Sequence, residues 1–284
     1  MFTNTIKTTI LLGALAGVFI GMGKFAGGNT GMVIGLVLAL AINFGSFWFS
    51  DKIVLKMHNA KQVKSGDYFE LVCDLARRNK MPIPKVFIIE SASPNAFATG
   101  RSPAHASVAC SQSLMNILTR EELQGVMAHE LSHVKNRDTL IQTIAVTFAS
   151  AISFIAQMMQ WAAIFGMGSN SDDGNDTGSI VGMIAIMILA PLIAMLIQMA
   201  ISRQREFIAD RGAAKLMGTG MPLINALQKL ELAASSGVKS NITKESVSSL
   251  YIINPFRASA VAAWFSTHPK TEARIAALKR YKHQ

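Results

Sequence analysis

Two histidines and a glutamate lie close together near the middle of the chain, in the run His129-Glu130-Leu131-Ser132-His133. Four residues is just over one helical turn, so on a helix the two imidazoles share one face, one turn apart. That spacing lets both rings bind one tetrahedral Zn²⁺ ion, with Glu130 facing the open coordination position. A carboxylate at that position can accept a proton from an activated water. The pattern therefore predicts a zinc-dependent hydrolase, if the chain supplies a third ligand.

The sequence around this motif predicts the helix that must present it. Thr119-Arg120-Glu121-Glu122 is a capping box, in which the side chains of Thr119 and Glu122 each satisfy a backbone N–H at the helix start. Apolar residues then recur at helical spacing, at Leu123, Val126, Met127, Leu131 and Val134. Both histidines consequently lie in the middle of the helix, where their side chains are presented rigidly.

The third ligand must come from a more distant part of the chain. Asp138 is five residues past His133, about 140° round a continuing helix from it, which points its carboxylate elsewhere. The next acidic residues, in 168–179, fall in a loop that is expected across a membrane. Glu206 is the first carboxylate after that loop, and Asp210 lies one turn further on. We expect Glu206 to be a ligand and Asp210 to orient a ligating histidine through its other ring nitrogen. Pairing of both carboxylates with neighbouring arginines is the alternative.

The composition predicts a membrane protein. The chain has 284 residues, of which 50% are hydrophobic and 15% charged, and its mean hydropathy is +0.34. Four segments are apolar over about 20 residues, enough to cross a bilayer: 6–22, 32–49, 140–167 and 180–201. A signal peptide fits the first segment less well, because a second apolar run follows after a short Gly-rich turn. Buried core helices fit the third and fourth less well, because both are long and uncharged.

The distribution of Lys and Arg predicts the orientation of these segments. Positive charges follow the second segment, at Lys52, Lys56, Lys61 and Lys64, and others flank the third and fourth. The loop between the third and fourth segments carries three Asp and neither Lys nor Arg. Both termini and the bulky polar segments are therefore expected on the cytoplasmic side. The net charge of +10 then reflects this topology and contact with the lipid bilayer. We expect no nucleic-acid partner, because the basic flanks lack interleaved aromatic residues.

The polar segment 51–138 is expected to hold a helix over 61–79, strands over 85–90, 94–100 and 106–111, and then the motif helix. An exposed sheet edge beside a metal can hold an extended peptide by main-chain hydrogen bonds. We expect that substrate-binding edge at Asn95, Ala96, Phe97 and Ala98. An ordinary strand in a small sheet is an equally good interpretation of the same residues.

The C-terminal part adds a helix over 221–234 and another over 270–283. The second helix follows Thr267-His268-Pro269, which places Pro at the first helical position. His268 and Arg274 are the polar groups here that could reach a site. From the sequence alone, ordinary surface positions are the favoured interpretation for both.

Together these segments resemble the HtpX family of membrane-bound zinc metalloproteases, relatives of the CAAX prenyl proteases. The resemblance covers nearly the whole chain and rests on the order of its parts. These parts are the two N-terminal apolar segments, Pro94 to Ala98, the His-Glu-x-x-His motif, the second apolar pair, Glu206 to Asp210, and Thr267-His268-Pro269 through Arg274.

The resemblance implies roles for individual residues. It implies that His129, His133 and Glu206 ligate one Zn²⁺ ion per chain, with Glu130 as general base. Asp210 would support the metal ligands, and the strand from Asn95 to Ala98 would bind substrate. His268 and Arg274 would stabilise the oxyanion or position the peptide. The implied activity is cleavage of misfolded or damaged membrane proteins and unfolded polypeptides at the cytoplasmic face of the bacterial inner membrane, as part of stress-related quality control.

The expected fold is a mainly α membrane protein with a small β-sheet, in which four transmembrane helices carry a cytoplasmic zinc-metalloprotease domain of the gluzincin type. Its expected parts are a transmembrane hairpin at 1–50, a cytoplasmic segment at 51–138, a second hairpin at 139–202, and a cytoplasmic part at 203–284 that completes the zinc site.

Two other classes stay open. One is an intramembrane protease with the motif inside a span, although the charged residues on both sides of the motif argue against it. The other is a non-catalytic scaffold with a structural zinc. Structural sites commonly have four protein ligands that include Cys, whereas the set expected here has three ligands and no Cys. Cys73 and Cys110 are expected to be reduced and buried.

Overall fold

The computed structural model describes residues 2–142, 144, 203–235 and 269–281. Most of the predicted second hairpin (139–202) and the candidate residue His268 lie outside these described residues. The described part is mainly helical and contains one four-stranded sheet. The coarse prediction of a mainly α protein with a small β-sheet is therefore confirmed.

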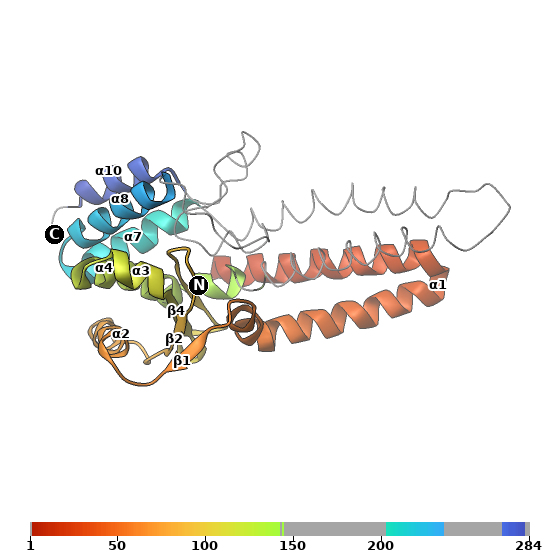
Figure 1. Ribbon diagram of the computed structural model, residues 1–284. Helices are drawn as coiled ribbons and strands as arrows, with labels where there is room; N and C mark the ends of the chain where they lie inside the picture. Colours follow the sequence, from red (N-terminus) through yellow and green to blue (C-terminus); the bar gives the residue numbers. More distant parts are fainter. Residues whose placement is uncertain (1, 143, 145–202, 236–268, 282–284) are drawn as a thin grey trace.

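Helix α1 (Phe2–Met57) forms a hairpin of two arms that lie side by side (Figure 1). The chain reverses near Gly28, whose φ of 57° is a backbone conformation that only glycine adopts readily. A Cβ atom at Gly23 would collide with the backbone of Gly31, so the absence of side chains lets the arms approach. Further along, Asn43 Nδ2 donates a hydrogen bond of 3.3 Å to the carbonyl oxygen of Leu12 in the other arm.

The second arm of this hairpin has the character of a membrane span. Residues Gly28–Phe49 are the one stretch of the described chain that is long and apolar enough to cross a bilayer, with a mean hydropathy of 2.0. Large side chains such as Val37 and Phe44 are 59% and 63% exposed along it. An apolar surface of this extent is unfavourable in water and marks a contact with lipid or protein. Crossing of the bilayer by four spans stays a prediction.

The sheet contains β1 (Lys61–Val63), β2 (Lys85–Ile89), β3 (Ala96–Thr99) and β4 (Ser107–Ser111), in the order β1-β2-β4-β3. Strands β2 and β4 are parallel, and the other two pairs are antiparallel. All three predicted strands are present. Strand β3 is an edge strand, with Phe97 opposite Ala109 of β4, and among the described residues no strand pairs with its outer side.

The start of the helix predicted over 61–79 is wrong. Residues 61–63 are strand β1, and helix α2 (Asp67–Arg78) begins only after Gly66. Gly66 has a φ of 98°, which interrupts helical geometry. Pairing with β2 satisfies the backbone hydrogen bonds of residues 61–63 in β1. In addition, Lys61 Nζ lies 2.6 Å from Glu90 Oε1.

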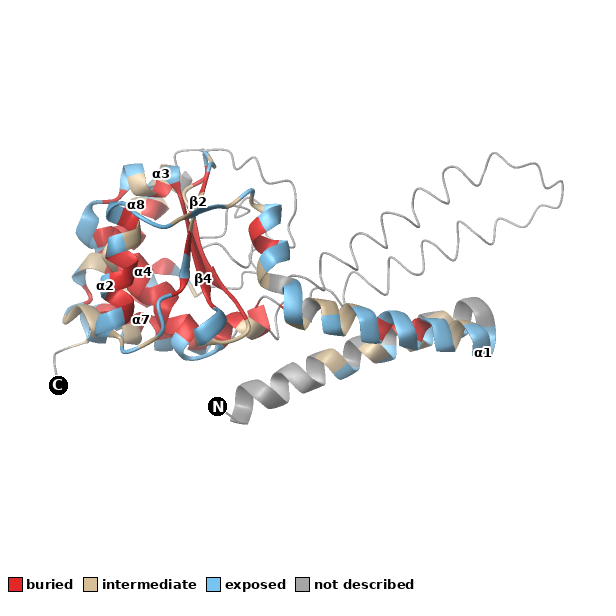
Figure 2. Cartoon of the chain, turned by 90° about the horizontal axis from the view of Figure 1, so that it is seen from below, coloured by how far each residue is buried: buried red, intermediate tan, exposed pale blue. Residues whose placement is uncertain are grey.

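The two faces of the sheet are covered differently. Figure 2 shows α2, α4, α7 and α8 on one side of the sheet and α1 on the other. Alternate residues of β3 follow this division, because Ala96 and Ala98 belong to the large core under the helices. Phe97 instead packs with Val54 and Leu55 at the end of α1. Strand β3 therefore lies between the end of the α1 hairpin and the helical layer.

Helix α4 (Arg120–Lys135) runs through the middle of the helical layer. It packs against β3, α2, α7 (Arg203–Met217) and α8 (Met221–Ser235). The predicted capping box is present, with Thr119 as N-cap and Glu122 reaching back to it. Helix α10 (Thr271–Lys279) covers α7 and α8, and the short α3 (Gln112–Ile117) and the 3₁₀ turn η1 (Pro103–His105) complete the described part.

Candidate metal centre

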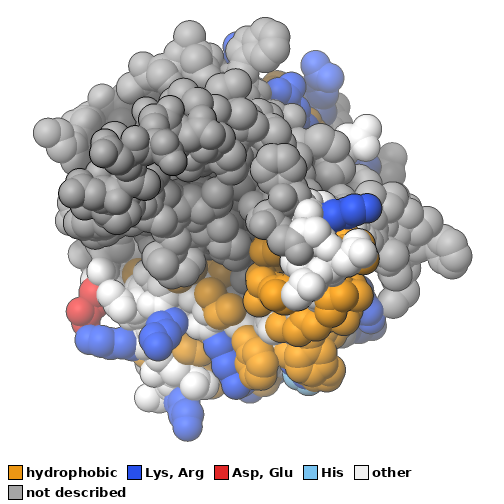
Figure 3. Space-filling view, turned by 90° about the vertical axis from the view of Figure 1, so that its right-hand side faces the viewer, with side chains coloured by type: hydrophobic (Ala, Val, Ile, Leu, Met, Phe, Trp, Pro, Cys, Tyr) orange, Lys and Arg blue, Asp and Glu red, His pale blue; other side chains and the backbone are white. Residues whose placement is uncertain are grey.

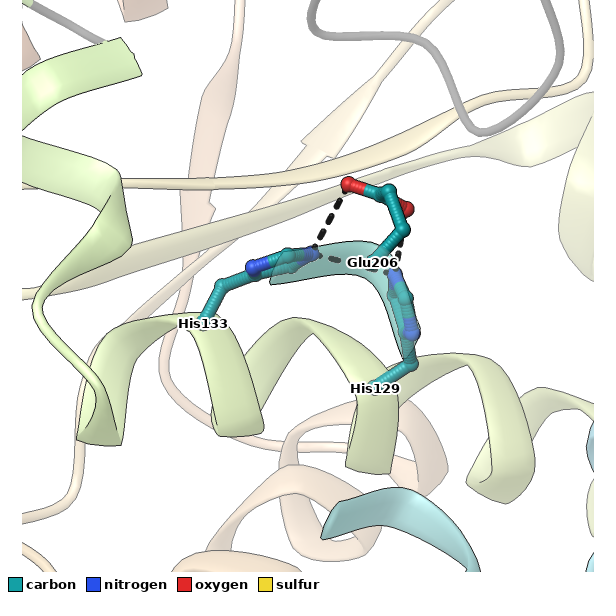
Figure 4. A group of neighbouring side chains, drawn as sticks. All are labelled: His129, His133 and Glu206. Carbon is teal, nitrogen blue, oxygen red and sulfur yellow. Dashed lines mark hydrogen bonds and ion pairs between the residues drawn. The ribbon is translucent and has the colours of Figure 1, made fainter. Parts of the chain in front are cut away.

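Helix α4 presents His129 and His133 side by side, as the four-residue spacing predicts (Figure 4). The two side chains are 3% and 4% exposed. Their rings meet edge to face, with centroids 4.7 Å apart, and the two Nε2 atoms are 3.1 Å apart. Both histidines therefore direct the same ring nitrogen toward one point.

Helix α7 brings Glu206 to the same point. Its Oε1 lies 3.4 Å from His133 Nε2, and its Oε2 lies 3.5 Å from His129 Nε2. Zinc–ligand bonds of about 2.0–2.1 Å in a tetrahedral site place neighbouring ligand atoms about 3.3–3.4 Å apart. The two Nε2 atoms, 3.1 Å apart, are close to this spacing, and each of them lies 3.4–3.5 Å from a different oxygen of Glu206. These three side chains could hold a metal ion.

The outer ring nitrogens explain why both Nε2 atoms are available. His129 Nδ1 lies 2.9 Å from Asp210 Oδ1, and His133 Nδ1 lies 3.2 Å from Asp138 Oδ2. An ionised carboxylate only accepts hydrogen bonds, so each Nδ1 donates, and when a ring is neutral its single proton lies on Nδ1. When both rings are neutral, the two Nε2 lone pairs face each other across 3.1 Å. That arrangement is unfavourable unless a cation lies between them, so the residues present fit a zinc ion.

Asp138 is the residue that sequence reasoning placed wrongly. A continuous helix would turn it away from His133, but α4 ends at Lys135 and a new helical segment begins at Asp138. Between them Arg137 has a φ of 59°, in the left-handed region. This break turns Asp138 back toward His133. Asn136 and Asp138 are residue types that favour such a break, which is the one sequence signal that could have indicated it.

Arg274 of α10 reaches the site and is held there by Asp210. Its Nε donates a bond of 2.9 Å to Asp210 Oδ2, and an Nη atom donates a bond of 2.6 Å to Asp210 Oδ1. The guanidinium also lies 3.7 Å from Glu206 Oε2. Arg274 is only 1% exposed. It is therefore a buried residue of the metal centre and not the surface residue that the sequence alone favoured.

The site is strongly charged and buried, which shifts the pKa of several of its groups. Burial acts to lower the pKa of His133, but Glu206 and Asp138 outweigh it and raise that pKa to about 10. Burial acts to raise the pKa of Asp210, but Arg274 and His129 outweigh it and lower that pKa to about 2. Burial is the largest cause that raises the pKa of Glu130, which is 6% exposed. A carboxyl with a raised pKa is suited to taking up and returning a proton.

The predicted substrate strand lies directly beside the motif helix. Strand β3 packs against α4, and its outer edge is open among the described residues. Asn95, which precedes it, is 3% exposed, and neither side-chain atom Oδ1 nor Nδ2 has a partner within the described part. Its backbone is fixed, because Asn95 N–H donates to Ser111 Oγ at 2.8 Å. A buried amide without partners is costly, unless a ligand satisfies it.

This arrangement of two histidines, a buried glutamate and a carboxylate from a second helix defines the class of metal-dependent hydrolases with a helical His-Glu-x-x-His site. The profile of peptidase family M48 matches residues 63–282. The chain therefore belongs to peptidase family M48 and is a metalloprotease.

Similar proteins carry the same designation as the predicted resemblance, which is thereby confirmed. "Protease HtpX homolog" of Syntrophotalea carbinolica is 48% identical over 278 residues, which cover 97% of this chain and 98% of the relative. "Protease HtpX" of Legionella pneumophila strain Philadelphia 1 is 46% identical, with the same coverage. The crystal structure of S. mikatae Ste24p is similar in fold, with a TM-score of 0.52 and 20% identity. The match covers 99% of this chain but spans only 66% of the Ste24p chain.

Proposed function

We propose that this metalloprotease is a zinc endopeptidase anchored in the bacterial inner membrane, which cleaves misfolded or damaged membrane proteins at the cytoplasmic face. The observation that carries the proposal is the convergence of His129 Nε2, His133 Nε2 and the buried Glu206 carboxylate, with the two nitrogens 3.1 Å apart and each within 3.5 Å of a carboxylate oxygen. The curated relatives named as HtpX proteases support the reaction. The role in stress-related quality control is proposed from the resemblance to that family.

Each residue of the site has a proposed task. His129, His133 and Glu206 hold the ion, and Asp210 fixes the ring of His129 through Nδ1. A zinc ion bound there would polarise the scissile carbonyl and lower the pKa of a water to about 7. Glu130 accepts a proton from that water while the water oxygen forms a bond to the carbonyl carbon of the substrate. Glu130 then gives the proton to the amine nitrogen as the C–N bond breaks.

We propose that Asn95 and β3 bind the substrate as an added strand. The open edge of β3 offers main-chain hydrogen bonds to an extended peptide, which suits unfolded polypeptides because these are free to adopt an extended conformation. The buried amide of Asn95 would gain its missing partners from the peptide backbone. For Arg274, the bidentate bond to Asp210 supports a role in holding the metal ligands, while the role of His268 stays the one implied by the resemblance.

The membrane arrangement is proposed from the apolar segments and from the charges beside them. Figure 3 looks at the end of the molecule toward which α1 extends; among the described side chains in this view, apolar ones gather with Lys and Arg side chains nearby, and few acidic ones are seen. At the base of the α1 hairpin, the guanidinium of Arg101 stacks 4.4 Å from the centroid of Trp48. Trp and basic residues are typical of the cytoplasmic interface of a span. Both termini and the zinc site would then lie on the cytoplasmic side.

Glu130→Gln tests the proposed reaction. Wild-type and variant proteins would each be assayed for zinc per chain and for cleavage of casein with and without a chelator. The variant should keep one zinc per chain and lose cleavage by about 100-fold or more, the usual contribution of a general base. Glu121→Gln is the matched control, because Glu121 is an exposed glutamate in the first turn of the same helix.

Three outcomes would contradict parts of the proposal. Equal cleavage by Glu130→Gln would remove the assigned role of Glu130. Full zinc retention by Glu206→Ala would place the third ligand elsewhere. Zinc binding by the wild type without chelator-sensitive proteolysis would favour the scaffold. The intramembrane alternative is tested by labelling Lys135→Cys from the aqueous side, which should succeed because Lys135 is exposed.

A further inference from the structure

We infer that Asp138 and Arg205 form a positioning pair that fixes the ring orientation and tautomer of His133. Asp138 and Arg205 are 3% and 7% exposed. Asp138 Oδ2 lies 3.2 Å from His133 Nδ1, and Asp138 Oδ1 lies 3.6 Å from Arg205 Nε. One carboxylate oxygen thus faces the histidine and the other faces the arginine. The pair deepens the proposed zinc site, on which it rests.

The same connection occurs on the other histidine, which supports a common purpose. His129 Nδ1 contacts Asp210, and Asp210 in turn is held by Arg274. Carboxylates that bind the outer nitrogen of a ligating histidine fix its tautomer and raise its basicity. An arginine behind each carboxylate limits how far that carboxylate can rotate. Each of the two histidines is therefore held in orientation by an aspartate, which in turn contacts an arginine.

The backbone adopts an unfavourable conformation to bring Asp138 into this position. Arg137 has a φ of 59°, which costs an L residue other than Asn, Asp or Gly roughly 1–2 kcal/mol. Such a conformation persists only where the surrounding structure determines it. Without the break, Asp138 would lie about 140° round the helix from His133 and could not reach its Nδ1. The strained turn is thus what makes the contact possible.

The pair also connects the two helices that supply the metal ligands. Asp138 follows directly on the end of α4, and Arg205 precedes Glu206 in α7. The same turn is attached to the substrate strand, because Thr139 Oγ1 donates a bond of 3.1 Å to the carbonyl oxygen of Gly100, just after β3. A purely structural role of Asp138 in this turn is the competing explanation, and the test must separate the two.

Asp138→Asn separates them through the direction of the new amide. The guanidinium of Arg205 donates, so it would attract the amide oxygen and leave the NH₂ group facing His133 Nδ1. His133 would then carry its proton on Nε2, the atom that must bind zinc. Zinc affinity should fall by about 10- to 100-fold. The thermal stability of the zinc-free protein should change little, because Asn keeps the size and a hydrogen bond of Asp.

A second substitution in the same background sharpens the test. Without the guanidinium, in Asp138→Asn combined with Arg205→Met, the amide can turn its oxygen to His133. The double variant should therefore bind zinc more tightly than Asp138→Asn alone. Asp74→Asn is the matched control, because Asp74 pairs with Arg78 at 3.2 Å on the surface of α2, and this variant should bind zinc like the wild type.

Zinc dissociation constants from competition with a chromophoric chelator, and melting temperatures of the zinc-free proteins, decide the matter. A wild-type dissociation constant in Asp138→Asn would overturn the inference, and so would a lower melting temperature with unchanged zinc affinity. A double variant that binds more weakly than Asp138→Asn would overturn the tautomer argument. Absence of zinc binding by the wild type would refute the proposed function itself, which distinguishes that failure from failure of the positioning pair.

Discussion

Gly212 is the position at which a single methyl group should move Glu206, the proposed third ligand, away from His129 and His133. It lies in α7, six residues past Glu206, and faces Ser132 of α4. A Cβ atom at Gly212 would be 2.5 Å from Ser132 Oγ and 3.0 Å from Ser132 Cβ. Ser132 Oγ cannot simply rotate away, because it donates a bond of 2.9 Å to the carbonyl oxygen of Ala128.

The magnitude for Gly212→Ala follows from two opposing effects. Alanine in a helix interior is about 1 kcal/mol more favourable than glycine. Forcing an extra methyl into a packed interface costs about 1–3 kcal/mol, so the net effect is a loss of up to about 2 kcal/mol in the free energy of unfolding. Carbon atoms prefer a separation of about 3.5–4.0 Å, so α7 must shift by about 0.5–1 Å. Zinc sites accept deviations of about 0.2 Å, and zinc affinity should therefore fall about tenfold, or ~1.4 kcal/mol.

The assay is a zinc competition titration together with thermal unfolding of wild type, Gly212→Ala and two comparison variants. Adding Ser132→Ala removes the closer contact and should restore part of the zinc affinity. Gly45→Ala is the control for a methyl group added to a helical glycine without a close contact, because a Cβ atom at Gly45 has no neighbour within 4 Å. If Gly212→Ala unfolds at a higher temperature and binds zinc like the wild type, this contact does not set the spacing of α4 and α7.

Three further predictions concern the cap of the motif helix and strand β3, the proposed substrate strand. Thr119→Ala removes the N-cap of α4 and should lower the free energy of unfolding by about 1 kcal/mol, measured with a denaturant. Burial opposes ionisation of Glu122, but Lys229 at 2.7 Å and Thr119 outweigh it and lower its pKa below the ordinary 4.5. The stability that ionised Glu122 contributes is therefore present above pH 4.5 and lost as the pH falls through the lower pKa of the folded protein, so the melting curves of wild type and Glu122→Gln should converge in acid. Asn95→Ala should raise KM about tenfold and leave the zinc content unchanged. An unchanged KM would show that the side-chain amide of Asn95 does not bind the substrate.

The parts of the site that could be predicted from the sequence are determined by local spacing or by the order of the apolar segments. The capping box and the apolar periodicity around His129 and His133 specify the helix within a single continuous segment. Glu206 could be predicted because few carboxylates remain on the expected cytoplasmic side after His133. Strand β3 could be predicted because residues 94–100 alternate in a way that is compatible with a short strand.

The parts that could not be predicted depend on backbone breaks and on contacts between distant helices. A positive φ at Arg137 has no strong signal, because arginine is not a residue type that favours it. Without that break, no pattern places Asp138 against His133. The contact of Gly212 with Ser132 likewise requires the packing of α7 on α4, since a helical glycine is by itself no evidence of a close approach. Both features concern how accurately the ligands are held, which local propensities do not encode.

The buried charges of the candidate metal centre favour the binding of a divalent cation. Six ionisable groups with 7% exposure or less surround the two histidines among the described residues: Glu130, Asp138, Glu206, Asp210, Arg205 and Arg274. Four carboxylates against two guanidinium groups leave a formal charge of −2, which one Zn²⁺ ion cancels. Uncompensated charge in a buried site costs several kcal/mol. Without the ion, protons on the histidines reduce the imbalance, which agrees with the raised pKa of both rings.

This charge balance predicts that the zinc-free protein is sensitive to the sign of the charge removed. Loss of a positive group should destabilise it more than loss of a negative group does. Arg274→Met leaves a formal charge of −3, so it should destabilise the zinc-free protein more than the zinc-loaded one. Glu206→Gln leaves a formal charge of −1 and removes a proposed ligand. It should therefore destabilise the zinc-free protein less than Arg274→Met does, and the variant should lose most of the rise in melting temperature that zinc produces. Melting temperatures of both variants with zinc and with chelator would measure this. Equal losses in both states for Arg274→Met would show that packing, rather than charge, accounts for the burial of this arginine.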